Sequence, residues 1–132
     1  MVKKTLAIIF VICLFLNSVL FAQAEEVMPL ANEYFHSAST ILYANKSVEF
    51  YCWTTAPADQ IRVSYCWLQQ KVDGKWEFVK HLTPPSHTVS GSMIFTVTVP
   101  YASEIGSGTY RVAATYNADG HAIAAYSGEK TF

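Results

Sequence analysis

Residues 48–80 constrain the fold more than any other stretch, because they contain three short strand patterns separated by two turn signals. Residues 48–54 and 61–70 alternate between two sets of side chains, with the period of two that a β-strand requires. Residues 75–80 follow an Asp-Gly dipeptide, the strongest short signal for a β-hairpin. The stretch therefore predicts an antiparallel all-β domain.

Four further segments have strand-like composition or alternation and are bounded by turn residues: 38–43, 93–99, 109–116 and 121–127. The sequence contains no amphipathic helical pattern, internal repeat or low-complexity tract. About seven short strands with turns at this spacing predict an antiparallel β-sandwich. We expect this domain to span residues 38–132, after an irregular lead-in over residues 25–37.

The N-terminus has the pattern of a secretory signal peptide. The basic residues Lys3 and Lys4 precede an apolar run over residues 6–16, and a small-residue site ends at Ala24. Asn17 ends the run well short of the ~20 apolar residues that span a membrane. We expect cleavage after Ala24, a secreted or cell-surface location, and no membrane insertion afterwards. An uncleaved N-terminal anchor is the alternative.

The charge pattern argues against two classes of partner. The chain carries a formal net charge of −1, and removal of the leader takes away two of its lysines. The remaining basic residues are scattered singly and form no run. Nucleic acid and anionic membranes are therefore not expected partners.

Two cysteines lie outside the leader, Cys52 and Cys66. In an exported protein a disulfide between them is the default expectation, contributing about 3 kcal/mol in the chain-entropy model. A plain hairpin centred on Asp59 would place them opposite each other, at a separation that suits a cross-strand bridge. If Tyr65 and Trp67 instead face the core, Cys66 faces outward unless a bulge intervenes. Two buried free thiols are the alternative.

Two segments resemble an immunoglobulin-type sandwich. Residues 67–71, WLQQK, are similar to the central-strand tryptophan segment of variable-type domains, and residues 106–112, GSGTYRV, to the segment with the tyrosine corner. The resemblance implies that Trp67 is the core indole and Tyr110 the corner tyrosine. Val112 stands where the second core cysteine of that family would be, so its inter-sheet disulfide cannot form.

The whole mature chain also resembles a family of small exported domains of Gram-positive bacteria that have no assigned function. The residues that carry this resemblance are the segments 48–52, 69–71, 73–76, 108–112 and 126–128. The resemblance implies a fold and an exported location, and no activity.

The best candidate binding residues are aromatic: Tyr51, Trp53 and Tyr65, together with Trp67. In the hairpin arrangement these four side chains would share one sheet face, where flat rings stack on sugars or anchor a protein partner. The alternative is that at least two of them, Trp67 above all, fill the core. Trp53 is the one we expect to be most exposed.

No pattern in the sequence predicts a catalytic or metal site. His81, His87 and His121 match no metal-ligand spacing, and no cofactor motif is present. The sequence lacks a Gly-x-Ser-x-Gly elbow and a Gly-rich phosphate loop. We therefore expect a non-enzymatic binding or interaction module for an unknown protein or glycan. A small secreted enzyme or toxin-like effector is the alternative, and a structural piece of a larger surface assembly is a third possibility.

Overall fold

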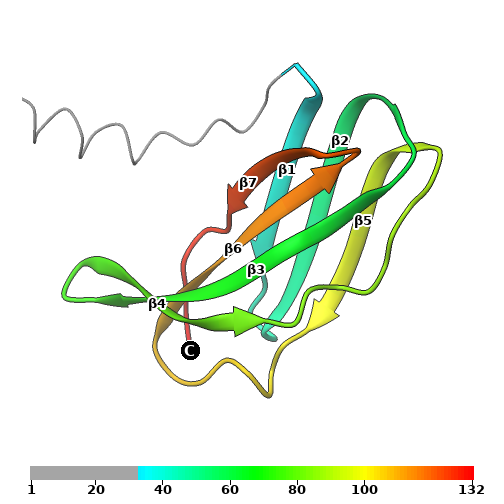
Figure 1. Cartoon of the computed structure of the whole chain (residues 1–132). Helices are drawn as coiled ribbons and strands as arrows, with labels where there is room; N and C mark the ends of the chain where they lie inside the picture. Colours follow the sequence, from blue (N-terminus) through cyan, green and yellow to red (C-terminus); the bar gives the residue numbers. More distant parts are fainter. Residues whose placement is uncertain (1–32) are drawn as a thin grey trace, which may run out of the picture.

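The computed structural model describes residues 33–132, which form a sandwich of two antiparallel β-sheets (Figure 1). The predicted all-β, immunoglobulin-like sandwich is confirmed. The predicted leader over residues 1–24 and most of the lead-in lie outside the described residues. The strands are β1 Phe35–Leu42, β2 Ser47–Ala58, β3 Ile61–Val72, β4 Lys75–Leu82, β5 Ser92–Pro100, β6 Thr109–Ala118, β7 His121–Tyr126 and β8 Lys130–Thr131.

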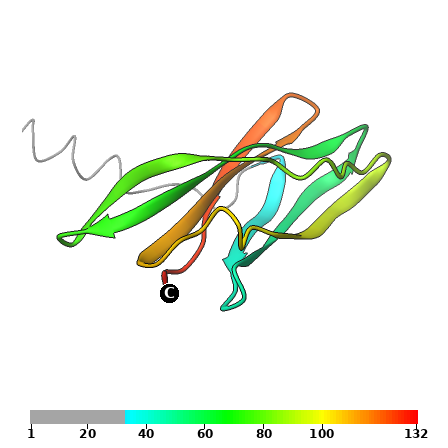
Figure 2. The ribbon, with the colours of Figure 1, turned by 90° about the horizontal axis from the view of Figure 1, so that it is seen from below.

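Sheet A has the strand order β1-β2-β5, and sheet B has the order β4-β3-β6-β7, with β8 also paired to β6. Across the sandwich, β2 contacts β6 and β3 contacts β5. Figure 2 shows the two sheets stacked, with the tip of the β3–β4 hairpin projecting beyond sheet A. The order is that of an immunoglobulin-type sandwich in which β4 extends the second sheet, as in variable-type domains.

Two Asp-Gly turns set the registers of the hairpins in sheet B. Asp73 and Gly74 have φ angles of 51° and 77°, and Asp119 and Gly120 have φ angles of 50° and 84°. Positive φ at both central residues is the geometry of the tight hairpin turn that the sequence predicts. The turns place Val72 opposite Lys75 and Ala118 opposite His121.

The predicted hairpin between β2 and β3 is wrong, because the chain crosses from sheet A to sheet B at that point. The Asp119 carboxylate accepts hydrogen bonds from the backbone N–H groups of Asp59 and Gln60, at 2.9 and 3.0 Å. These bonds fix the crossing to the β6–β7 turn. Hence Cys52 and Cys66 lie on strands of different sheets and are not cross-strand neighbours.

The predicted Cys52–Cys66 disulfide is absent, and both thiols are free and buried. Cys52 pairs with Ala38 and Phe95 in sheet A, and its strand contacts β6 across the core. Cys66 lies in β3, which contacts β5 instead. The two strands are therefore offset across the sandwich. The alternative of two buried thiols describes the structure correctly.

A bulge in β3 explains why its inward face is only partly predictable from alternation. The pairing with β6 shifts register between Val63 and Tyr65, so Ile61 and Val63 face the core, and then Cys66 and Leu68 do. Tyr65 is 62% exposed. The prediction that Trp67 is the core indole is wrong, since Trp67 is half-buried on the outer face of sheet B.

The core contains tyrosines whose hydroxyl groups bind backbone. The Tyr110 hydroxyl donates to the Ser107 carbonyl at 3.0 Å, which confirms the predicted tyrosine corner. The Tyr116 hydroxyl donates to the Ser39 carbonyl at 2.6 Å and accepts from the backbone N–H of Tyr51 at 3.2 Å. Because Tyr116 is in sheet B and its partners are in sheet A, this network joins the two layers.

Candidate functional site

The four predicted aromatic candidates do not form one group. Tyr51 and Trp53 lie on β2 and face outward from sheet A, whereas Tyr65 and Trp67 lie on β3 and face outward from sheet B. The prediction of a single shared face is therefore wrong, because it depended on a hairpin between these strands. Each pair has to be considered with its own neighbours.

The outer face of sheet A has a small aromatic contact around Trp53, which is 40% exposed. The prediction that Trp53 is the most exposed of the four candidates is wrong, because Tyr65 is 62% exposed on the outer face of sheet B. Trp53 pairs with Ile94 on one side, and the His36 ring lies 4.5 Å from its ring centre on the other. Tyr51, in the next outward row of the same strand, is half-buried and pairs with Ser39 and Thr96. This face places one Trp-His pair among small and β-branched side chains.

The outer face of sheet B is much richer in aromatic residues. Neighbouring outward rows place Trp76 beside Lys71, then Phe78 beside Gln69, then His81 beside Trp67. On the other side of β3, Gln69 pairs with Arg111 and Trp67 with Ala113, and Ala113 pairs with Tyr126 on β7. We call the set Tyr65, Trp67, Trp76, Phe78, His81, Arg111 and Tyr126 the aromatic face.

Ring contacts join these rows into a continuous surface. Trp67 meets Tyr126 edge-on with their ring centres 6.4 Å apart, and Phe78 meets His81 with centres 5.1 Å apart. Ala113, between Trp67 and Tyr126, is fully buried although it lies on the outer side of the sheet. The large rings therefore cover the backbone of β6 and leave an aromatic surface over four strands.

Arg111 is held at the centre of the aromatic face. Its guanidinium carbon lies 4.5 Å from the Trp76 ring centre and 4.4 Å from the Tyr126 ring centre, which are cation–π distances. Its Nε donates a 2.7 Å hydrogen bond to Gln69 Oε1. Partial burial lowers the pKa of the Arg111 guanidinium, but arginine remains protonated in proteins. The result is a fixed cation between two rings.

The terminal amino groups of Arg111 have no hydrogen-bond partner among residues 33–132. A guanidinium held at its Nε and flanked by rings has lost rotamer freedom before any ligand arrives. Two parallel N–H groups of this kind fit a carboxylate in a bidentate hydrogen bond. The terminal amino groups of Arg111 are therefore hydrogen-bond donors without a partner in the described residues.

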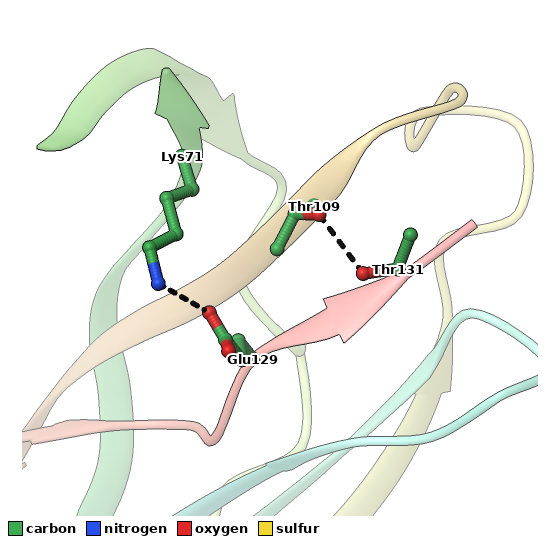
Figure 3. A network of polar contacts seen from close by, with 4 residues as sticks. All are labelled: Lys71, Thr109, Glu129 and Thr131. Carbon is green, nitrogen blue, oxygen red and sulfur yellow. Dashed lines mark hydrogen bonds and ion pairs between the residues drawn. The ribbon is translucent and has the colours of Figure 1, made fainter. Parts of the chain in front are cut away.

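The C-terminal tail borders the aromatic face (Figure 3). Lys71 Nζ lies 3.1 Å from a Glu129 carboxylate oxygen, and the hydroxyl groups of Thr109 and Thr131 are 2.9 Å apart. The Lys71 ammonium also lies 5.8 Å from the Trp76 ring centre. An exposed ion pair of this kind contributes little stability. The pairing of β8 with β6 keeps the tail beside β6, at one end of the face.

The most accessible part of the aromatic face lies along β3 and β4. Tyr65 and Phe78 are 62% and 58% exposed, the two most exposed large apolar side chains of residues 33–132. A hollow of about 310 Å³ adjoins Tyr65 and His81, and Leu82 and Pro84 form its apolar wall. The hollow therefore lies beside Tyr65, the most exposed ring of the aromatic face.

The two cysteines and Asp119 serve the fold in the described part of the chain. Burial raises the pKa of the Cys52 thiol to about 12 and of the Cys66 thiol to about 11, so both are protonated and unreactive at neutral pH. The Asp119 carboxylate is occupied by the two backbone N–H groups of the β2–β3 crossing. Among residues 33–132 no three His, Cys, Asp or Glu side chains lie close enough to hold a metal ion.

The sequence matches no known family model, and no curated protein is significantly similar to it. No helix within residues 33–132 has the length and apolar composition to cross a membrane.

Sequence reasoning missed most of the aromatic face. Trp76, Phe78, Arg111 and Tyr126 were not among the predicted site residues. The Asp73-Gly74 turn was the signal that could have found two of them, because its register places Lys71 opposite Trp76 and Gln69 opposite Phe78. Arg111 and Tyr126 required the pairing of β3 with β6 and of β6 with β7, which no short-range pattern specifies.

Proposed function

We propose that this chain is an exported, non-enzymatic binding module that recognises a protein partner through the aromatic face of sheet B. The observation that carries the proposal is the clamped Arg111, held between Trp76 and Tyr126 with its terminal amino groups unpaired within residues 33–132. Trp, Tyr and Arg are the residue types that dominate the binding energy of protein interfaces. The predicted signal peptide supports the exported location.

A protein ligand fits this face better than a glycan does. Sugar rings stack on aromatic rings whose flat faces are accessible, whereas the guanidinium of Arg111 covers one face each of Trp76 and Tyr126. Trp67 and Tyr126 meet edge-on and so do not form a parallel platform. The clamped guanidinium instead favours a carboxylate surrounded by apolar side chains.

The charges around the face favour an acidic partner. Arg111, on β6, lies at the centre of the face. Lys71 and the exposed Arg62 lie toward opposite ends of β3. Glu129 neutralises Lys71 at the border of the face. We therefore infer a partner that presents an acidic residue next to an apolar or aromatic one.

Four single variants test the proposal in one binding assay. Purified wild type is presented to cell-surface protein extracts and to arrays of cell-wall and host glycans, in parallel with Arg111→Lys, Trp76→Ala, Trp53→Ala and Ile41→Ala. Arg111→Lys keeps the charge and loses the bidentate fork, so it separates geometry from net charge. Trp53→Ala and Ile41→Ala change exposed apolar residues on the other sheet.

The expected result is a captured surface protein whose affinity falls about 30-fold or more in Arg111→Lys and Trp76→Ala, as for interface hot spots. Trp53→Ala and Ile41→Ala should bind like wild type. Binding to glycans alone would contradict a protein partner. Binding that is lost in Trp53→Ala and kept in Arg111→Lys would contradict the choice of face.

A further inference from the structure

One strand edge of the sandwich is left without the usual protection against pairing. β5 pairs with β2 along one side only, and no backbone hydrogen bond joins its other side to any residue from 33 to 132. An open edge presents a row of unpaired N–H and C=O groups to another strand. Natural sheets protect such edges with charges, prolines or bulges.

The other edges show such protection. β4, the open edge of sheet B, carries Lys75, Glu77 and Lys80, and its pairing with β3 shifts register opposite Gln69. β1 and β7, the other two edges, contact each other across the sandwich, and Thr40 Oγ1 on β1 donates to the Ala125 carbonyl on β7 at 3.3 Å. β5 is therefore an exception within the same molecule.

The sequence of β5 favours pairing around Thr96 and Thr98, whereas the Ile94 N–H and C=O groups are both bonded to the Ser92 hydroxyl, at 3.1 and 3.2 Å. SMIFTVTVP contains no charged residue, and its register with β2 is regular from Ile94 to Pro100. Ile94, Thr96 and Thr98 face outward and are exposed, while Val97 and Val99 face the core side. These β-branched residues have high strand propensity, and the only proline is the last residue.

On the core side of β5, Val97 and Val99 are only half-buried. The connection over residues 83–91 lies on the core side of the strand, where His87 is 5.5 Å from Phe95 between ring centres. A hollow of about 360 Å³ separates this connection from Val97 and Val99. A further strand beside β5 would bury more of both valines than the monomer does.

We propose that two copies of this chain associate through their β5 strands, which pair antiparallel and extend sheet A into one six-stranded sheet. A two-fold axis places each residue of β5 against a residue of the same segment. Any charge near the axis would then meet a like charge, and β5 has none. With the axis at Val97, Thr96 faces Thr98 of the second copy, a favourable cross-strand pair.

The occupant is a second copy because the edge has no feature that selects a different sequence. An uncharged strand of alternating threonine and valine is complementary to itself, whereas a dedicated partner strand is usually specified by charge or by a shaped pocket. The association leaves the aromatic face of sheet B open in both copies. It is therefore independent of the proposed function.

The test is the oligomeric state of the protein, expressed as the full chain in an exporting host and used in the form that is recovered. Sedimentation velocity from about 10 µM to about 1 mM covers the range in which small interfaces associate. With the axis at Val97, the double variant Thr96→Lys/Thr98→Lys places like charges opposite each other on both sides of the axis. Ser39→Lys is the matched control, since Ser39 and Thr96 flank Tyr51 in the same row of sheet A.

The expected result is a concentration-dependent dimer in wild type and Ser39→Lys, and self-association at least about tenfold weaker in the double variant. Hydrogen exchange provides a second readout, in which β5 amides gain protection as the wild-type concentration rises. A monomer over the whole range would overturn the proposal. So would a dimer that the double variant leaves intact, or one whose amide protection rises in β4 instead of β5.

Discussion

The core and the aromatic face both contain tyrosines, but the two sets differ in what their hydroxyl groups bind. In the core, Tyr101, Tyr110 and Tyr116 each donate a hydroxyl hydrogen bond to a backbone carbonyl, at 2.6, 3.0 and 2.6 Å. On the aromatic face, Tyr65 and Tyr126 have no hydroxyl hydrogen bond within residues 33–132. The Tyr126 ring instead contacts the Arg111 cation. A tyrosine whose hydroxyl is used inside the fold supports structure, and one whose hydroxyl is unused remains available to a partner.

The largest expected effect concerns the two cysteines of the core. Both are buried and unpaired, so a maleimide should reach Cys52 and Cys66 only when the whole domain unfolds, a step of roughly 5–15 kcal/mol in small domains. Labelling in increasing urea, followed by peptide mapping, measures this. In denatured protein that has not been reduced, both cysteines should label. If they label only after treatment with a reductant, the thiols are paired and the described core is incorrect.

Two phenylalanines give the next largest contrast. Phe95 is fully buried and contacts Tyr116, so Phe95→Ala should lower the free energy of unfolding by about 3–5 kcal/mol. Phe78, 58% exposed, should change it by less than about 0.5 kcal/mol when replaced by alanine. Urea titration followed by circular dichroism compares the two variants. Similar losses of stability in both would mean that Phe78 belongs to the core and not to the aromatic face.

Removing single tyrosine hydroxyl groups should also affect stability differently in the core and on the aromatic face, by a smaller amount. Tyr116→Phe removes the bonds to the Ser39 carbonyl and the Tyr51 N–H, and should cost about 1–3 kcal/mol because buried backbone groups lose their partner. Tyr65→Phe is the matched control on the aromatic face and should be close to neutral. Equal urea midpoints for wild type and Tyr116→Phe would show that its hydroxyl does not join the two sheets.

The smallest effect concerns acid stability at Asp119, on the surface beside the core. Hydrogen bonds from the backbone N–H groups of Asp59 and Gln60 hold the pKa of the Asp119 carboxyl below its ordinary value of 3.8. The unfolded chain therefore takes up this proton at a higher pH than the folded chain does. The stabilisation is present above the unfolded pKa and is lost as pH falls through the folded pKa.

Asp119→Asn tests this pH dependence, because asparagine also tolerates the positive φ of 50° at this turn. Between about pH 5 and pH 2, the free energy of unfolding should fall less steeply in the variant than in wild type. Chemical denaturation at stepped pH measures both slopes. Parallel slopes would show that the carboxylate does not hold the β2–β3 crossing.

Local patterns in the sequence account for much of the fold. Side-chain alternation located the strands, and the Asp73-Gly74 and Asp119-Gly120 dipeptides set two hairpins, because both turns require positive φ. The crossing at Asp59 was mistaken for a hairpin. What defines it is the side chain of Asp119, 60 residues away in the sequence, and no local signal carries that information.

The candidate site was less predictable than the fold. One extra residue in β3 between Val63 and Tyr65 reverses which side chains face inward, and it makes Trp67 an outer residue where the resemblance implied a core indole. The clamp on Arg111 requires four strands in register, since Trp76 is on β4, Gln69 on β3 and Tyr126 on β7. Such a site follows from non-local pairing, which alternation along single strands does not specify.

The proposed role of the aromatic face is tested most directly by site-specific photo-crosslinking. A benzophenone amino acid replaces either Phe78 on sheet B or Ile41 on sheet A, both of which are exposed. The two proteins are irradiated with the same cell-surface extract. Our account predicts a defined crosslinked protein at position 78, abolished by Arg111→Lys, and no such product at position 41. The same product at position 41, or one at position 78 that persists in Arg111→Lys, would contradict it.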